Sequence, residues 1–132
     1  MGWLPFMTRS APVISIVDDD RSVRRALHRL VRLAGYTVEV FASAGEFLAS
    51  APRGRIACVV LDIQLESGRM GGFELQARLA ADGVAVPIIF ITAHDDPPTR
   101  ERVRQSGAAG YLPKPFDEGA LLDIIRTVAG QP

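Results

Sequence analysis

Five short apolar runs, each followed by a stretch with helical periodicity, constrain the fold of this chain more than any other feature. The runs are Val13–Val17, Thr37–Val40, Ile56–Leu61, Pro87–Ile91 and Ala109–Leu112. Several of them are continuous rather than alternating, which is typical of strands buried on both faces of a parallel sheet. A strand–helix unit repeated five times predicts an α/β fold, a doubly wound sandwich around a five-stranded parallel sheet.

Residues that commonly start and stop helices bound the predicted helices. Asp20 is the expected N-cap of the first helix, and Gly35 lies just past its end. Ser43 opens a capping-box pattern for the second helix, which is expected to stop before Pro52. The remaining helices are expected from Gly72 to Asp82, after Pro97-Pro98, and from about Asp117.

Length and composition indicate one globular domain. The chain has 132 residues, 48% hydrophobic and 23% charged, and its 15 basic and 15 acidic residues cancel. This balance gives no electrostatic sign of a nucleic-acid binder. Residues 1–11 are interpreted as a flexible arm, 12–129 as the folded domain and 130–132 as a tail.

Cysteine usage and the length of the apolar runs indicate a cytoplasmic protein. The single cysteine, Cys58, lies inside an apolar run, so no intrachain disulfide can form, and a buried free thiol suits a reducing compartment. The apolar runs are too short to cross a membrane, and the first twelve residues lack the pattern of a secretory signal.

Polar residues follow the predicted strands at one end of the sheet. Asp18-Asp19-Asp20 follows the first strand, Asp62 the third and Thr92 the fourth, and Lys114 comes soon after the fifth. Ligands of open α/β sheets bind outside the carboxyl ends of the strands, so these residues are expected in one crevice. Taken singly, each has an ordinary explanation as a turn, cap or surface residue.

The combination predicts phosphoryl chemistry. Clustered carboxylates repel one another and need a counter-ion, and all-oxygen ligands suit Mg²⁺, for which Asp19 and Asp62 are the expected ligands. A carboxylate attacks phosphorus when cations neutralise the incoming charge, and Asp62 has the central place for this role. Thr92 offers a hydroxyl and Lys114 an ammonium to two phosphoryl oxygens.

The chain from Pro12 to about Ala129 resembles the receiver domain of bacterial two-component response regulators. Four separated motifs occur in the family's order, with Gly107-Ala108-Ala109 before Tyr111 as a fifth match. They are Ile16–Asp20 followed by Val23-Arg24, Val60–Asp62, Ile91–Ala93 and Lys114–Phe116. The resemblance implies a flavodoxin-like (βα)5 sandwich with strand order 2-1-3-4-5.

The resemblance also implies the roles of the acidic residues. Asp62 would accept a phosphoryl group from a sensor histidine kinase or a histidine phosphotransfer protein. Asp19 would bind Mg²⁺, with Mn²⁺ as a substitute, while Asp18 would be a second-sphere acid and the backbone carbonyl of Gln64 a further ligand. Asp20 extends the acidic run and is interpreted as the helix cap.

The resemblance also implies roles for residues around the acceptor. Thr92 and Tyr111 match a pair of side chains that reorient on phosphorylation, and Ala93 is small enough to admit the phosphoryl group. Gln64 and His94 would flank the path of the hydrolysing water, with His94 partly shielding the phosphoryl group. The Lys114–Pro115 bond matches a cis peptide of the family.

The function implied is that of a signalling domain, not an enzyme beyond its own phosphorylation and dephosphorylation. Phosphorylation would switch a surface for a downstream protein partner, and a phosphorylation-linked homodimer is a further expectation. Neither nucleic acid nor membrane is an expected partner. The chain stops soon after the fifth helix, so it is either a stand-alone regulator or part of a longer one.

One segment departs from the family's pattern. The family usually has a proline soon after the acceptor and a glycine eight residues beyond it. Here the helix-opening glycine, Gly72, lies ten residues after Asp62, and no proline intervenes. The loop is therefore expected to be two residues longer and more flexible.

Three other functions fit the residues less well. A phosphatase of the haloacid-dehalogenase type would use Asp18-x-Asp20, but the length leaves no room for a cap domain. A flavin-binding module needs a phosphate-binding loop after the first strand, where an acidic triplet would repel phosphate. A pseudo-receiver that binds partners without phosphorylation would not need the intact acceptor set.

Overall fold

The computed structural model describes residues 12–50, 55–65 and 70–132. Five strands alternate with five helices along this part of the chain. The strands are β1 (Val13–Val17), β2 (Thr37–Phe41), β3 (Ile56–Asp62), β4 (Ile88–Thr92) and β5 (Gly110–Pro113). The helices are α2 (Arg21–Leu33), α3 (Ala44–Ser50), α4 (Gly72–Ala81), α5 (Pro97–Gln105) and α6 (Glu118–Ala129).

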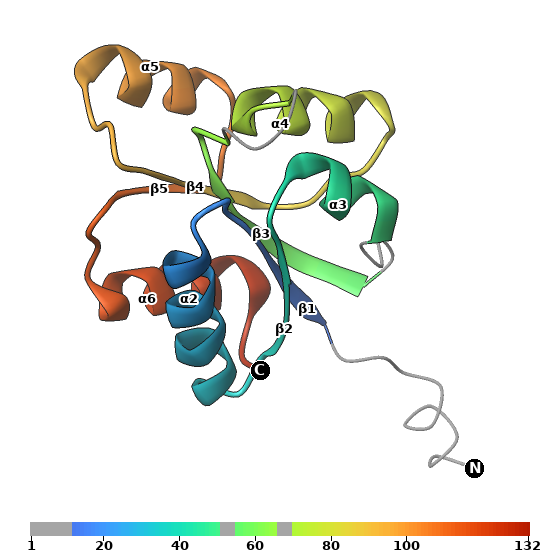
Figure 1. Ribbon diagram of the computed structural model, residues 1–132, viewed down its shortest axis with the longest axis vertical. Coiled ribbons are helices and arrows are strands. Elements are labelled where there is room, and N and C mark those ends of the chain that lie inside the picture. Colours follow the sequence, from blue (N-terminus) through green and yellow to red (C-terminus); the bar gives the residue numbers. More distant parts are fainter. Residues whose placement is uncertain (1–11, 51–54, 66–69) are drawn as a thin grey trace.

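All neighbouring strands pair in parallel, in the order β2-β1-β3-β4-β5. Helices α3, α4 and α5 cover one face of the sheet, and α2 and α6 cover the other (Figure 1). The predicted doubly wound sandwich and its strand order are thereby confirmed. From β1 the chain continues to β2 on one side and then crosses to β3 on the other side of β1, so a crevice is expected where β1 and β3 end side by side.

The core consists of two apolar layers, one on each face of the sheet. Side chains of β1 alternate between them, with Ile14 and Ile16 packed toward α2 and α6 and Val17 packed toward α3 and α4. All five residues of β1 and all five of β4 are buried, which explains why neither strand alternates apolar residues with exposed polar ones.

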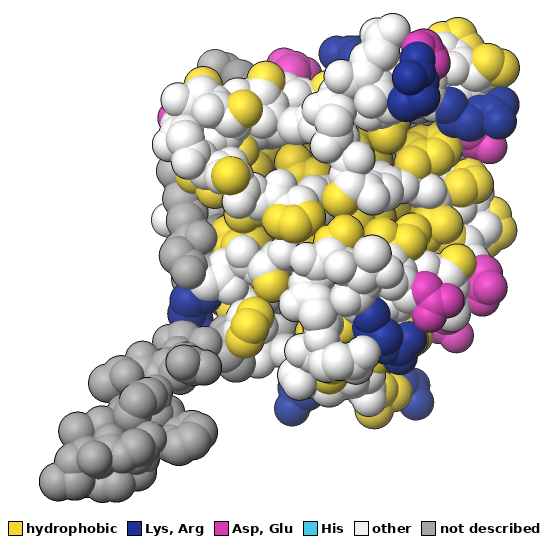
Figure 2. All heavy atoms as spheres, turned by 180° about the vertical axis from the view of Figure 1, so that it is seen from behind, with side chains coloured by type: hydrophobic (Ala, Val, Ile, Leu, Met, Phe, Trp, Pro, Cys, Tyr) yellow, Lys and Arg dark blue, Asp and Glu magenta, His cyan; other side chains and the backbone are white. Residues whose placement is uncertain are grey.

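Cys58 lies in the α2–α6 layer, and burial raises the pKa of its thiol to about 12. The view from behind shows a band of hydrophobic side chains between the two helical layers, with charged side chains toward the periphery (Figure 2). No helix in the described residues is both long and apolar enough to span a membrane.

Most of the predicted element ends hold in the structure. The Asp20 carboxylate accepts hydrogen bonds from the N–H groups of Ser22 and Val23, as expected of an N-cap. Gly35 has φ +105°, a conformation that lets it close the end of α2 where other residues would be strained.

One predicted helix start was wrong. Pro97 and Pro98 form the first turn of α5 instead of preceding it, because Asp96 is the N-cap and its carboxylate accepts from the N–H of Thr99. Proline suits a first helical turn, where its missing N–H has no intrahelical partner. Three predictions lie outside the described residues: the arm at 1–11, the stop before Pro52, and the longer loop, of which residues 66–69 are not described.

Candidate functional site

Three carboxylates meet where β1 and β3 end. Oxygen atoms of Asp18, Asp19 and Asp62 all lie within 4.8 Å of one another. Asp62 is the last residue of β3, and Asp18 follows Val17, whose register partner on β3 is Leu61. Asp18 is fully buried and Asp62 is 4% exposed. Carboxylates this close and this poorly hydrated need positive charge nearby.

Lys114 supplies part of that charge. Its Nζ lies 2.7 Å from Oδ2 of Asp18 and 3.2 Å from Oδ2 of Asp62. The backbone N–H of Lys114 donates to the carbonyl of Thr92, which holds the loop after β5 against β4. The peptide bond between Lys114 and Pro115 is cis, as the resemblance implied. Burial opposes the charge on Lys114, but the hydrogen bond to Asp18 and the charges of Asp62 and Asp18 outweigh it and raise its pKa.

The environment of Asp62 favours its protonated form. Burial, followed by the charge of Asp18, raises the pKa of Asp62 to about 6. The charge of Lys114 and the hydrogen bond from the backbone N–H of Gln64 act in the opposite direction without cancelling this rise. A further cation beside Asp62 would favour its carboxylate form.

The donor set of the site fits a small divalent cation. Carboxylate oxygens of three residues gather in this cluster, and the Lys114 ammonium contacts those of Asp18 and Asp62. Mg²⁺ prefers such ligands. Asp20 is not part of the cluster, because its Oδ1 accepts from Ser22 N–H and Val23 N–H at the start of α2.

Gly72 brings the start of α4 against the acceptor strand. A Cβ atom at this position would lie 2.6 Å from the carbonyl oxygen of Asp62 and 2.9 Å from Cα of Ile63. The N–H of Gly72 donates to the carbonyl of Ile63. The helix-opening glycine predicted from the sequence is therefore required by close approach of two backbones, and it fixes the residues that follow Asp62.

Thr92 is the buried last residue of β4, and its hydroxyl is engaged on both sides. It donates to Oε1 of Gln64 at 2.6 Å and accepts from the backbone N–H of His94 at 2.9 Å. Gln64 is tied to the acceptor, because its backbone N–H donates to Oδ1 of Asp62 at 3.0 Å. Nothing in the sequence pattern predicted the side-chain bond between Gln64 and Thr92.

The other predicted residues lie at the margin of this cluster. Ala93 and His94 are exposed at the end of β4. The Tyr111 hydroxyl donates to Oδ1 of Asp95 at 2.7 Å, and Arg100 Nε lies 3.3 Å from the same oxygen. The hydroxyl groups of Tyr111 and Thr92 thus have different partners in this structure, and the reorientation of the two side chains on phosphorylation stays a prediction. The contact with Asp95 has no signal in the sequence.

The chain is similar to known proteins over most of its length. The family model described as response regulator receiver domain matches residues 14–126. The response regulator protein TodT of Pseudomonas putida is 41% identical over 123 residues, which cover 93% of this chain and 53% of TodT. The transcriptional regulatory protein FixJ of Azorhizobium caulinodans is 36% identical over 126 residues, covering 95% and 58% of the two chains. This chain therefore spans little more than half the length of these relatives.

Solved structures of the same fold agree with this assignment. The response regulator StyR superposes with a TM-score of 0.82 and 44% identity, over 91% of this chain and 60% of StyR. A response regulator receiver protein from Burkholderia phymatum gives a TM-score of 0.77 and 43% identity, over 92% and 97% of the two chains. From the family model, the relatives and the fold together, this chain belongs to the response regulator receiver domain family.

Proposed function

We propose that Asp62 accepts a phosphoryl group from a sensor histidine kinase or a histidine phosphotransfer protein, and that the modification switches a protein-interaction surface. The observation that carries this proposal is the cluster of Asp18, Asp19 and Asp62, in which the Lys114 ammonium contacts the two buried carboxylates, Asp18 and Asp62. Membership in the receiver family supports it, since receiver domains of response regulators act with histidine kinases. The downstream partner and a phosphorylation-linked homodimer remain predictions.

The chemistry is a transfer between two nucleophiles. An oxygen of Asp62 forms a bond to phosphorus while the bond from phosphorus to the donor breaks, and the donor leaves with that electron pair. The Lys114 ammonium and the Thr92 hydroxyl are the groups of this chain that would stabilise the phosphoryl oxygens. Mg²⁺ or Mn²⁺, held by Asp19, Asp62 and the carbonyl of Gln64 with Asp18 behind them, would neutralise the remaining charge.

Uptake from a small phosphodonor tests this function directly. Incubation of the protein with acetyl phosphate and Mg²⁺ is expected to add one phosphoryl group. Intact mass spectrometry measures this gain in mass. Addition of a chelator is expected to prevent the reaction. Absence of any uptake in the presence of Mg²⁺ would instead favour a receiver that binds partners without phosphorylation.

Asp19→Ala is expected to weaken Mg²⁺ binding while the fold stays intact, because it removes one acid from the cluster. Titration calorimetry of the metal alone, without a phosphodonor, measures this effect. Metal-free Asp19→Ala is expected to be at least as stable as the parent, since repulsion among the carboxylates falls.

Asp20→Ala is the matched control for the metal prediction. It removes the neighbouring carboxylate, which caps α2, so it is expected to cost about 1 kcal/mol of stability and leave the Mg²⁺ affinity unchanged. If Asp19→Ala bound Mg²⁺ as well as the parent and Asp20→Ala did not, the roles of the two residues would have to be exchanged.

His94→Ala is expected to hydrolyse its acyl phosphate faster than the parent. The backbone of His94 is fixed by its hydrogen bond to Thr92 and its side chain is exposed at the end of β4, where it can shield the phosphoryl group from water. Loss of label after removal of the donor, followed at two pH values, measures the effect. Equal decay of the two proteins at both values would rule out shielding.

A further inference from the structure

The Thr92 hydroxyl has one proton to donate, and in this structure it donates that proton in a hydrogen bond to Gln64. Thr92 is fully buried, so no solvent competes for its hydroxyl. The bond to Oε1 of Gln64 is 2.6 Å long, at the short end of the range for a hydroxyl donor. The hydroxyl oxygen also accepts a hydrogen bond from the backbone N–H of His94. Thr92 therefore cannot donate to another oxygen until it releases Gln64.

Gln64 is well placed to hold Thr92 and also to release it. Its backbone is anchored to the acceptor through the bond from its N–H to Oδ1 of Asp62. Its side chain is half-buried and lines a cleft of about 360 Å³ between the N-terminal parts of α4 and α5, beside Phe73, Pro98 and Arg102. The amide consequently has space to turn away from Thr92 without movement of either helix.

We propose that the Gln64 side chain is a latch that holds Thr92 away from the phosphoryl position in the unphosphorylated protein. Gln64 is in this sense a positioning residue, which acts on the phosphoryl group through Thr92. Binding of the phosphoryl group must break one neutral hydrogen bond, so the latch lowers the affinity of the site for that group. This inference rests on the proposed function of Asp62 as acceptor.

Gln64→Met tests the latch, because methionine keeps the length of the side chain and loses the acceptor. The probe is beryllium fluoride with Mg²⁺, a mimic of an acyl phosphate that does not hydrolyse, so its affinity is independent of any role of Gln64 in hydrolysis. The variant is expected to bind the probe about fivefold more tightly, because binding no longer has to break one neutral hydrogen bond. Equal or weaker binding overturns the proposal.

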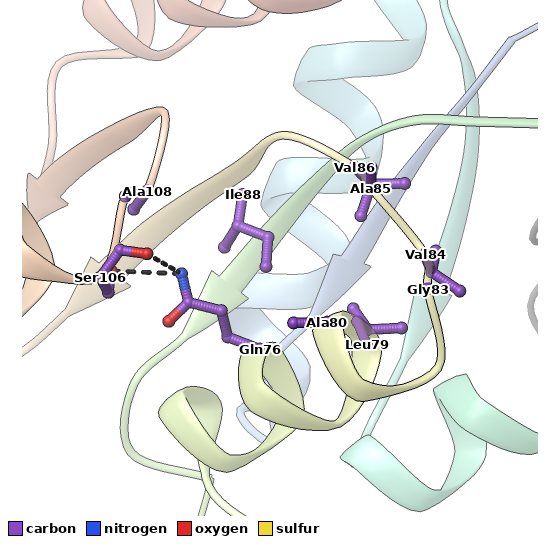
Figure 3. Close-up of a pocket in the computed structure, with 11 residues that line it drawn as sticks. Gln76, Leu79, Ala80, Gly83, Val84, Ala85, Val86, Ile88, Ser106 and Ala108 are labelled. Atoms are coloured by element: carbon purple, nitrogen blue, oxygen red, sulfur yellow. Dashed lines mark hydrogen bonds between the residues drawn. The ribbon is translucent and has the colours of Figure 1, made fainter.

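Gln76→Met is the matched control. The Gln76 amide also bridges two elements, donating from α4 to the carbonyl and the hydroxyl of Ser106 just after α5, both at 3.2 Å. It lies in a different cavity, of about 400 Å³, formed with Leu79, Val84 and Ile88 (Figure 3). This variant loses the amide hydrogen bonds to Ser106, which do not involve Thr92, and is expected to bind the probe like the parent.

A double-mutant cycle shows whether the gain passes through Thr92. In a Thr92→Val background no hydroxyl remains to be held, so Gln64→Met is expected to give no gain in affinity. A gain that persists in this background overturns the latch. A crystal structure of the parent bound to beryllium fluoride tests the same point without any substitution. In that structure Oγ1 of Thr92 and Oε1 of Gln64 are expected to lie beyond hydrogen-bond distance. A retained hydrogen bond between them contradicts the proposal.

These outcomes separate the latch from the function on which it rests. If the parent neither binds beryllium fluoride nor takes up a phosphoryl group, the assignment of Asp62 fails. If the parent does both and Gln64→Met binds no more tightly, only the latch fails.

Discussion

Asp62→Asn is expected to abolish phosphoryl uptake from acetyl phosphate, and Asp62→Ala is expected to do the same. Both changes remove the nucleophile itself, and neither an amide nor a methyl group replaces a carboxylate in attack on phosphorus. The Asn variant keeps the shape of the side chain and removes the charge whose burial, followed by repulsion from Asp18, raises the pKa of Asp62 to about 6. Its fold is therefore expected to be at least as stable in metal-free buffer.

Asp123→Asn serves as the control for this loss. Asp123 lies on α6, where its side chain is 78% exposed and pairs with Arg126. The control is expected to take up the phosphoryl group at the rate of the parent. Continued phosphorylation of Asp62→Ala, measured by intact mass under the same conditions, would contradict the assignment of the acceptor.

Lys114→Met is expected to lower the phosphorylation rate by about 10²-fold, the usual effect of removing one group that stabilises charge in a transition state. It is also expected to destabilise the metal-free protein by about 3 kcal/mol, because two buried carboxylates lose their shared ammonium. Chemical denaturation with and without Mg²⁺ measures this cost, and Mg²⁺ is expected to restore part of the stability.

The pH dependence of the Lys114 variant gives an independent check. Lys114 lowers the pKa of Asp62, so its removal raises that pKa further above the value of an unfolded chain. The folded variant then binds more protons than the unfolded one, and its stability is expected to increase as the pH falls from about 8 to about 5.

Arg126→Met is the control for the loss of a positive charge. Its partner Asp123 is exposed, so the expected change is under about 1 kcal/mol and independent of Mg²⁺. A Lys114→Met variant as stable and as rapidly phosphorylated as this control would show that Lys114 is an ordinary surface lysine.

The fold was predictable because its strands are buried on both faces. The apolar runs of β3 and β4 are continuous for this reason, and the polar residue at which each run stops marks the edge of the sheet. Asp62 and Thr92 were found in this way. The strand order came from the resemblance to a family, since periodicity identifies strands and says nothing about which strands are neighbours.

Side-chain pairings at the site were beyond prediction from the sequence. The bond from Thr92 to Gln64 and the bond from Tyr111 to Asp95 both depend on rotamers and on the path of a loop. Many residue types at positions 64 and 95 are compatible with the same backbone. The close approach at Gly72 had a sequence signal, the glycine itself, but the reason for it emerged only from the distance to the Asp62 carbonyl.

The relatives are longer than this chain, which covers 53% of TodT and 58% of FixJ. The comparisons therefore place this chain in the receiver family, while the activity and partners of proteins of that length belong to those relatives.

Chemical trapping of the modified residue tests the central claim most directly. The parent protein is incubated with acetyl phosphate and Mg²⁺, the acyl phosphate is reduced with borohydride, and the reduced residue is located by peptide mass spectrometry. The proposed function predicts a single reduced residue, Asp62, and none when Mg²⁺ is removed. Trapping at Asp18 or Asp19, or phosphate found on His94 instead, would contradict it.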